Sequence, residues 1–582
     1  MSPINTSRHG FGWRTAGFCT VLVGLVLAIY AQTARFEFVN FDDDVHVTEN
    51  PQVTDGLTVD GVKWAFGIHG PSQWHPLAWI SHQTDCTLFG LDAGRHHLTN
   101  VALHLLASLL LYLACRRLTQ VAGASAFVAL AFAVHPLNVE SVAWVSERRN
   151  VLCAVFWFGT MWIYAGSRER PLGQRWWLVS LGHAAAVASK PLAITLPCTL
   201  LLLDAWPLAR WNGLSSTANE SQTTAFRLFV EKAPLFLLSI ASAVLSYACQ
   251  KSIGTVATLL SIPLTVRVGN AFAAYGWYLQ KFLWPSGLSC FYPHPALIDP
   301  DPWASLGAPA CAGLVLVASM TLIFLRLRRH HPWLLFGWLW YLGTLVPMIG
   351  LLQVGEQQYA DRYAYIPLVG LFVAAAFEVR SLAAASSRRG RWACVGAVGL
   401  LALWSVLSCR QAAVWHDSIA LFSHAVEATG RNHWGRNNLG EAYLRRGDRL
   451  QAIEEFYAAV QDVPSYARGH YNLGVALQDV GRTNLAISEF RTALQLDPGY
   501  REALQRLGAA LATTGRLTEA IRYFEQASTL APDDAQAQFN LGLALSAAGK
   551  KVEAERRLRE AIRLSPGWDA PRDALRTLQT AM

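Results

Sequence analysis

Three neighbouring carboxylates are the side chains of this sequence best suited to chemistry. Asp42, Asp43 and Asp44 follow one another in the string Phe-Val-Asn-Phe-Asp-Asp-Asp, directly after an apolar run. Like charges this close, at the edge of a region of low dielectric constant, oppose full ionisation and suit a general base or a cation site. A solvated acidic turn is the alternative interpretation.

Polar residues also interrupt the helix predicted to follow this loop. Asn100 and His104 are four positions apart, so they share one helix face, and His97 precedes them. Polar side chains in an apolar helix are costly unless they face protein or water. A buried functional site and hydrogen bonding between helices both account for them.

Further charged and imidazole side chains stand at the ends of other apolar runs: His135, Glu140, Arg148, Lys190, Arg267, Asp361 and Arg362. An arginine binds a phosphate through paired N–H donors, and Arg362 lies just before an apolar run, next to Tyr363. An interfacial anchor is the simpler explanation for such an arginine. Several cations and an acidic cluster on one face would suit an anionic substrate and an acid–base step.

The composition places these residues in an integral membrane protein. Of 582 residues, 53% are hydrophobic and 15% are charged, against about 25% charged in ordinary globular proteins. The net charge of +8 matches arginine-rich cytoplasmic loops and disfavours nucleic-acid binding. The ten cysteines form no CxxC pair, which disfavours a disulfide scaffold or a zinc module.

Eleven apolar runs predict a polytopic helical bundle. They cover about 16–34, 98–115, 121–137, 150–165, 176–207, 232–250, 266–284, 305–325, 332–350, 363–380 and 392–408. The run 176–207 is counted as one span, broken at Lys190-Pro191, and the first run as an uncleaved anchor. Arginine clusters at 116–117, 168–175, 326–329 and 388–391 are expected to be cytoplasmic. The loops 35–97, 135–149, 285–304 and 351–362 then share the other face with the C-terminal part.

The C-terminal part is a repeat array. The pair Leu-Gly recurs every 34 residues from Leu439-Gly440, and each unit ends in a proline such as Pro464. These units resemble tetratricopeptide repeats and predict an α-solenoid with a concave binding surface. The predicted fold class is all-α, with a membrane domain at 1–410 and a repeat domain at 411–582. The latter comprises a half repeat at about 415–432 and repeats at 433–466, 467–500, 501–534 and 535–568.

Several strings together resemble one known family. They begin at Asp42 and Asn50, at His97, at His135, at Lys190 and at Asp361, and they occur in the order membrane domain then repeats. The chain thus resembles the transmembrane and tetratricopeptide repeat-containing O-mannosyltransferases, in a bacterial form. These are glycosyltransferases of the GT-C superfamily.

The resemblance implies an inverting transfer of a sugar, mannose in the family, from a polyprenyl-phosphate carrier to Ser or Thr of a protein acceptor. It implies catalytic roles for Asp42 and Asp43. The third carboxylate, Asp44, leaves open which two aspartates are equivalent to the family's pair. The spacing from Asp42 to Asn50 matches the family's pattern best and favours Asp42 as the base. Substrate-binding roles fall to His97, Asn100, His104, His135, Glu140, Arg148, Lys190, Arg267, Asp361 and Arg362.

The same resemblance implies partners and a location. The donor and surrounding lipid would lie in a bacterial inner membrane, with the repeats on the periplasmic or external side, holding a protein acceptor. No nucleic acid is expected. A divalent metal could bridge the acidic cluster and the phosphate, although no ligand set with recognisable spacing is present. A transporter or flippase of lipid-linked sugars and a non-catalytic membrane-anchored scaffold are the competing hypotheses.

Overall fold

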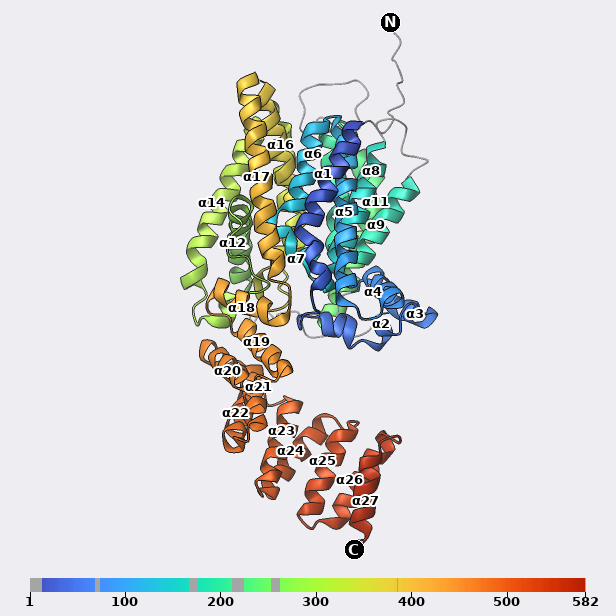
Figure 1. Ribbon diagram of the computed structural model, residues 1–582, viewed down its shortest axis with the longest axis vertical. Coiled ribbons are helices and arrows are strands. Elements are labelled where there is room, and N and C mark those ends of the chain that lie inside the picture. The colour runs from blue at the N-terminus through green and yellow to red at the C-terminus, as the bar shows by residue number, and fades with distance from the viewer. Residues whose placement is uncertain are drawn as a thin grey trace. The chain divides into compact units, whose positions relative to one another are not determined.

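The computed structural model of the chain describes residues 13–67, 74–166, 176–211, 224–252, 262–384 and 386–580 (Figure 1). It divides into two compact units, Met1–Thr429 and Gly430–Met582. Helices make up nearly all of the described secondary structure, which confirms the all-α class. A small antiparallel pair, β1 (Tyr292–Pro293) and β2 (Gln357–Tyr359), is the exception among the described residues.

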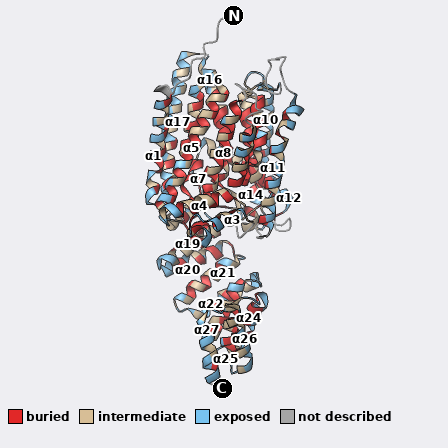
Figure 2. Ribbon diagram, turned by 90° about the vertical axis from the view of Figure 1, so that its right-hand side faces the viewer, coloured by how far each residue is buried: buried red, intermediate tan, exposed pale blue. Residues whose placement is uncertain are grey.

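The first unit is a bundle of long apolar helices. Its main helices are α1 (Trp13–Tyr30), α5 (Ala93–Thr119), α6 (Ala122–Val134), α8 (Arg148–Ala165), α9 (Trp176–Ser189), α10 (Leu196–Ala205), α11 (Ala225–Ser252), α12 (Leu264–Leu283), α14 (Trp303–Leu327), α15 (Pro332–Leu345), α16 (Leu368–Ala384) and α17 (Ser387–Ala413). Buried residues gather along α5, α8 and the short α7 (Val139–Ala143) in the centre of this unit (Figure 2).

Five helices of the described chain are long and apolar enough to cross a membrane. They cover Thr15–Arg35, Ala93–Thr119, Ala225–Lys251, Trp303–Leu327 and Ser387–Ala413. A sixth is added if α6 and the segment Pro136–Ala143, bent by 57°, count as one span. The chain is a membrane protein, and the count of eleven crossings stays a prediction. Arg168, Arg170 and Arg175 of one predicted cytoplasmic cluster lie outside the described residues.

The stretch 176–207, counted above as one span broken at Lys190-Pro191, reverses direction at this break. Lys190 Nζ lies 2.8 Å from Glu147, just before α8 begins. Asp204, in contrast, accepts a hydrogen bond of 2.6 Å from Tyr164 at the other end of α8. Lys190 is extended, with φ −155° and ψ 133°, because the proline that follows disfavours helical backbone. Hence α9 and α10 run in opposite directions along α8.

Asp204 is also the centre of a second buried ion pair. Lys232 of α11 donates to its other oxygen at 2.5 Å, and both side chains are almost fully buried. Tyr164, Asp204 and Lys232 therefore join α8, α10 and α11.

The loop between the first two long helices folds into a small helical layer. It contains a π-helical turn at Asp44–Thr48, then α2 (Pro51–Thr54), α3 (Val59–Phe66) and α4 (Pro76–Phe89). Apolar residues of the loop pack around Trp79, together with Val145 from the next outer loop. The two predicted outer loops thus share one core, which fixes the acidic string against residues 139–149.

The last helix of the first unit is α18 (Ser418–Thr429), shown next to the lower end of α17 in Figure 1. The predicted half repeat at 415–432 covers this helix, which therefore packs with the membrane unit. The short helix α13 (Pro295–Ile298) lies beyond β1 in the same unit.

The second unit is the predicted repeat solenoid. Its helices are α19 (His433–Arg446), α20 (Arg449–Asp462), α21 (Ala467–Asp479), α22 (Thr483–Leu496), α23 (Arg501–Thr513), α24 (Leu517–Leu530), α25 (Ala535–Ala547), α26 (Lys551–Leu564) and α27 (Asp569–Thr580). A Cβ added to Gly474 would lie 2.6 Å from the ring of Phe490, so the glycine is required for that helix pair to approach. Gly481 turns the chain between the same helices with φ +78°.

Candidate active site

The first two aspartates of the acidic string have opposite environments. Asp43 is fully buried. Its Oδ1 accepts hydrogen bonds from the Ser146 N–H at 3.0 Å and the Ser146 hydroxyl at 2.5 Å, and its Oδ2 accepts one from Val39 N–H at 3.1 Å. Burial raises the pKa of Asp43 to about 7, although these hydrogen bonds favour the charged form. Asp43 therefore joins the two predicted outer loops from a buried position.

Asp42 is exposed, and its carboxylate makes no hydrogen bond to the described residues. Its backbone is left-handed, with φ +63°, and its carbonyl accepts the N–H of His46 at 2.8 Å. Aspartate tolerates this conformation better than most residues. The turn directs the Asp42 side chain outward while Asp43 points inward, so Asp42 is the member of the pair that a hydroxyl group can approach.

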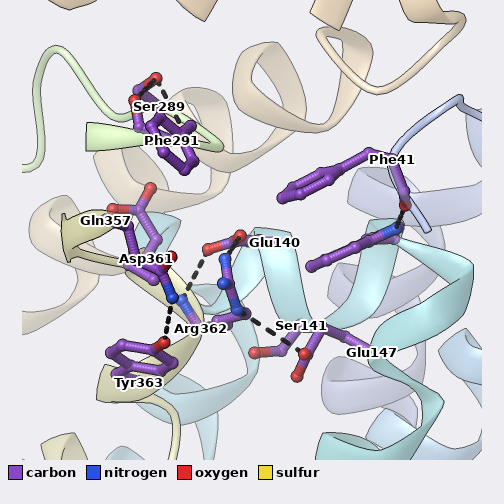
Figure 3. A network of polar contacts seen from close by, with 12 residues as sticks. Phe41, Glu140, Ser141, Glu147, Ser289, Phe291, Gln357, Asp361, Arg362 and Tyr363 are labelled. Carbon is purple, nitrogen blue, oxygen red and sulfur yellow. Dashed lines mark hydrogen bonds and ion pairs between the residues drawn. The ribbon is translucent and has the colours of Figure 1, made fainter. Parts of the chain in front are cut away.

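Two carboxylates hold three cations beside this turn. Arg362 Nη1 lies 2.6 Å from Glu140, whose other oxygen accepts the Arg362 N–H at 2.7 Å (Figure 3). Glu147 pairs with Lys190 at 2.8 Å and with Arg149 at 2.7 Å. We call these five residues the cation cluster. Its formal charges sum to +1, so it would attract an anion.

The cation cluster also keeps donors for a ligand. Within the described chain, Nη2 of Arg362 and Nη1 of Arg149 make no hydrogen bond. Burial alone would raise the pKa of Glu147, but Arg149, Lys190 and Arg362 lower it below its usual range. Glu147 is therefore ionised and holds the cations in place.

Aromatic rings connect the acidic turn to the cation cluster. Phe41, next to Asp42, stacks on Trp144 with ring centroids 4.1 Å apart and planes 9° apart. Trp144 Nε1 donates to the Phe41 carbonyl at 2.8 Å. The Arg362 guanidinium lies 5.3 Å from the Trp144 ring and 5.9 Å from the Phe41 ring, within cation–π range. One aromatic pair thus contacts Arg362 and includes the residue that precedes Asp42.

Arg148 and Asn100 are placed in a different network. Arg148 is fully buried and donates to Asn100, to Ser81 at 2.9 Å, to Asp85 at 2.7 Å and to the His96 carbonyl at 2.8 Å. Asn100 in turn donates to the Trp144 carbonyl at 2.8 Å. Arg148 therefore ties α4, α5 and α8 together, whereas the next residue, Arg149, lies in the cation cluster.

The predicted histidines bind groups within the protein. His97 contacts the Glu37 carbonyl at 3.1 Å. His104 lies 2.6 Å from the Tyr365 hydroxyl and 3.1 Å from the Ala133 carbonyl. His135 accepts the Leu137 N–H at 3.2 Å through Nδ1. These contacts favour hydrogen bonding within and between elements over ligand binding.

Two further predicted residues, Asp361 and Arg267, bind other groups of the first unit. Asp361 accepts the Tyr292 hydroxyl at 2.9 Å, so it joins β1 to the turn that carries Arg362. Burial raises the pKa of Asp361 well above its ordinary value. Arg267 donates to the Ile262 carbonyl at 2.9 Å near the start of α12.

Sequence reasoning missed Arg149, Ser146 and His46. Arg149 follows Arg148 directly, and no local signal separates the two. The His46 N–H donates to the Asp42 carbonyl at 2.8 Å, so His46 belongs to the turn that carries Asp42. Among the described residues, no group of three or more His, Cys, Asp or Glu side chains has the geometry of a metal site.

The fold and the site define a class: a multi-helix membrane protein with a tetratricopeptide-repeat solenoid and a buried polar site at one end of its helices. Family models described as Tetratricopeptide repeat match residues 437–501 and 500–566. The chain is similar to the TMTC proteins. It is 31% identical over 159 residues to the Homo sapiens "Protein O-mannosyl-transferase TMTC1", a match that covers 26% of this chain and 18% of that protein.

A second match covers more of this chain. The Drosophila melanogaster "Protein O-mannosyl-transferase Tmtc3" is 23% identical over 458 residues, which cover 67% of this chain and 48% of that protein. The chain thus spans between about a fifth and a half of the length of the curated relatives it matches. Among solved structures, YrrB, a "TPR protein with an unusual peptide-binding site", is 23% identical and covers 27% of this chain and 82% of its own, with a TM-score of 0.26.

Proposed function

We propose that the chain is a GT-C type glycosyltransferase. It would move a sugar, mannose by analogy with its relatives, from a polyprenyl-phosphate carrier to Ser or Thr of a protein acceptor. The names of the TMTC relatives support this activity. The observation that carries the proposal is the exposed, unbonded Asp42 beside a cation cluster with spare donors.

In the proposed reaction, Asp42 is the general base. Its carboxylate accepts the proton of the acceptor hydroxyl while that oxygen attacks the anomeric carbon. The bond between the anomeric carbon and the phosphate oxygen breaks on the opposite face, so the sugar inverts and the phosphate leaves on the lipid. Asp43 keeps the turn in shape through Ser146 and takes no proton from the substrate.

The cation cluster would bind the phosphate. Arg362 and Arg149 would donate from N–H groups that the described residues leave unused, and Lys190 would add a point charge. Charge grows on the phosphate as the bond breaks, and preorganised donors stabilise it without reorganisation. Glu140 and Glu147 hold the donors in position.

The proposed setting is a bacterial inner membrane, with Asp42, the cation cluster and the repeats on the periplasmic or external side. A lipid-linked donor would reach the site from the surrounding membrane. The repeats would hold a protein acceptor, as solenoids do on their concave surfaces.

The test is sugar transfer in membranes that contain the full chain, with radiolabelled polyprenyl-phosphate mannose and the host's own periplasmic proteins. Asp42→Asn is compared with Asp44→Asn, a matched change in the same string. We expect Asp42→Asn to lower transfer by about 10²-fold or more and Asp44→Asn to stay close to wild type. Equal transfer by all three chains would refute the proposal, and label carried across the membrane while still on lipid would favour a transporter.

A further inference from the structure

We propose that the segment 415–422, which leads into the repeats, positions the acidic turn that carries Asp42. Ser418 and the carbonyl of His416 would fix the backbone that ends in Asp42. Ser418 is then a positioning residue, because it acts through Asn40 and Phe41. The inference rests on the proposed function, since it concerns the same aspartate.

The chain before Asp42 depends on distant partners for its hydrogen bonds. Residues 36–39 belong to no helix or strand. The Glu37 N–H donates to the His416 carbonyl at 3.0 Å. The Asn40 N–H donates to the Ser418 hydroxyl at 2.9 Å, across 378 positions of sequence. Backbone amides that leave water must find such acceptors.

Aromatic contacts reinforce the same attachment. Phe36 packs edge-on against His416 at 5.5 Å between centroids, and Phe41 against Phe422 at 6.4 Å. Trp415 stacks on Trp144 at 5.8 Å and is 2% exposed. The pair Phe41 and Trp144 is therefore enclosed by residues from the segment that follows α17.

The contacts between residues 36–41 and the segment 415–422 affect catalysis because Asp42 lies two residues beyond Asn40. Its left-handed backbone holds the carboxylate outward only while the turn keeps its shape. A displacement of about 1 Å in a reacting group can cost about 10²-fold in rate. Loss of one anchoring hydrogen bond should therefore slow the chemical step while leaving the cation cluster intact.

The chain offers a matched control on the same helix. Ser423 lies in α18, one and a half turns from Ser418, and makes no side-chain hydrogen bond to the described residues. The full-length variants Ser418→Ala, Ser423→Ala and Ser418→Thr are purified in detergent. Hydrogen exchange is followed in the peptide 36–46, and turnover and donor KM are measured with polyprenyl-phosphate mannose.

We expect Ser418→Ala to speed exchange at the Asn40 amide by about fivefold to tenfold. It should lower turnover by about tenfold with an unchanged donor KM. Ser418→Thr keeps the hydroxyl and should restore both, and Ser423→Ala should change neither. Exchange and turnover in Ser418→Ala equal to those in Ser423→Ala would overturn the inference, as would a failure of Ser418→Thr to restore them.

The two proposals fail in different ways. Full sugar transfer by Asp42→Asn would refute the proposed function and, with it, the positioning role of Ser418. Loss of transfer in Asp42→Asn together with wild-type turnover in Ser418→Ala would refute the positioning role alone.

Discussion

Ser146 donates two hydrogen bonds to one oxygen of Asp43, one from its backbone at 3.0 Å and one from its hydroxyl at 2.5 Å. The two residues are 103 positions apart. This contact joins the first predicted outer loop to the second, and it supports a role for Asp43 in the shape of the turn.

Asp43→Asn should therefore reduce stability more than chemistry. The amide oxygen of the new Asn can still accept from Ser146. Its NH2 group would face the Val39 N–H, and because both groups are donors, this hydrogen bond is lost. An unsatisfied buried group costs about 1–3 kcal/mol. Thermal unfolding of the purified chain should show this loss, and the remaining folded fraction should transfer sugar near the wild-type rate. A folded Asp43→Asn chain without transfer would instead identify Asp43 as the base.

The same residue predicts a pH dependence of stability. Burial raises the pKa of Asp43 from 3.8 to about 7, so the folded state binds the proton more tightly than the unfolded state. The contribution of Asp43 is then complete below about pH 4 and is lost as the pH rises through about 7. The Tm difference between wild type and Asp43→Asn should shrink from about pH 5 to about pH 8. A difference that stays constant or grows over that range would contradict the raised pKa.

Glu147 and Lys190 should couple strongly in a double-mutant cycle. Glu147→Gln removes the carboxylate that holds Lys190 and Arg149, leaving buried cations unpaired. Breaking a buried ion pair from one side costs about 3–5 kcal/mol. Adding Lys190→Met to Glu147→Gln should recover part of that loss. Unfolding free energies from denaturant titration measure the coupling, and additive losses would show that the two charges do not interact.

Substitutions of the neighbouring residues Arg148 and Arg149 should have opposite effects: the first should lower stability and the second should lower sugar transfer. Arg148→Gln leaves Asp85 buried without its partner and should destabilise the chain by about 3–5 kcal/mol. Arg149→Gln should leave the Tm nearly unchanged but lower sugar transfer by about 10²-fold, as expected for a lost donor to a developing charge. Transfer and Tm measured on both variants separate the two roles. Equal effects on both quantities would refute this division.

Much of the architecture could be predicted from the sequence. The spacing of Leu439-Gly440 and its equivalents predicts the repeats, because Gly474 and Phe490 pack as one unit that recurs. The acidic turn and Arg362 could also be singled out, since both stand at the ends of apolar runs.

The remaining features depend on long-range contacts that leave no local pattern. Nothing near Asp43 indicates that Ser146 will bury it, and nothing near Arg148 indicates that Asp85 will pair with it. The reversal at Lys190-Pro191 likewise depends on contacts at the two ends of α8. Glu147 at one end binds Lys190, and Tyr164 at the other end binds Asp204. A proline marks a break in a helix, but the direction that the chain takes afterwards is decided by its partners.

The ion pair between Asp204 and Lys232 has a consequence for biogenesis. The Asp204 carboxylate meets a first cationic partner early in synthesis, because Arg210, six positions on, lies 3.0 Å from its Oδ1. Lys232 follows 28 positions after Asp204. A lone carboxylate in a membrane segment costs about 2.5–3.5 kcal/mol at the bilayer centre. We therefore expect α10 to enter the membrane with Arg210 as its counter-ion, and Lys232 to join the pair once α11 has been made.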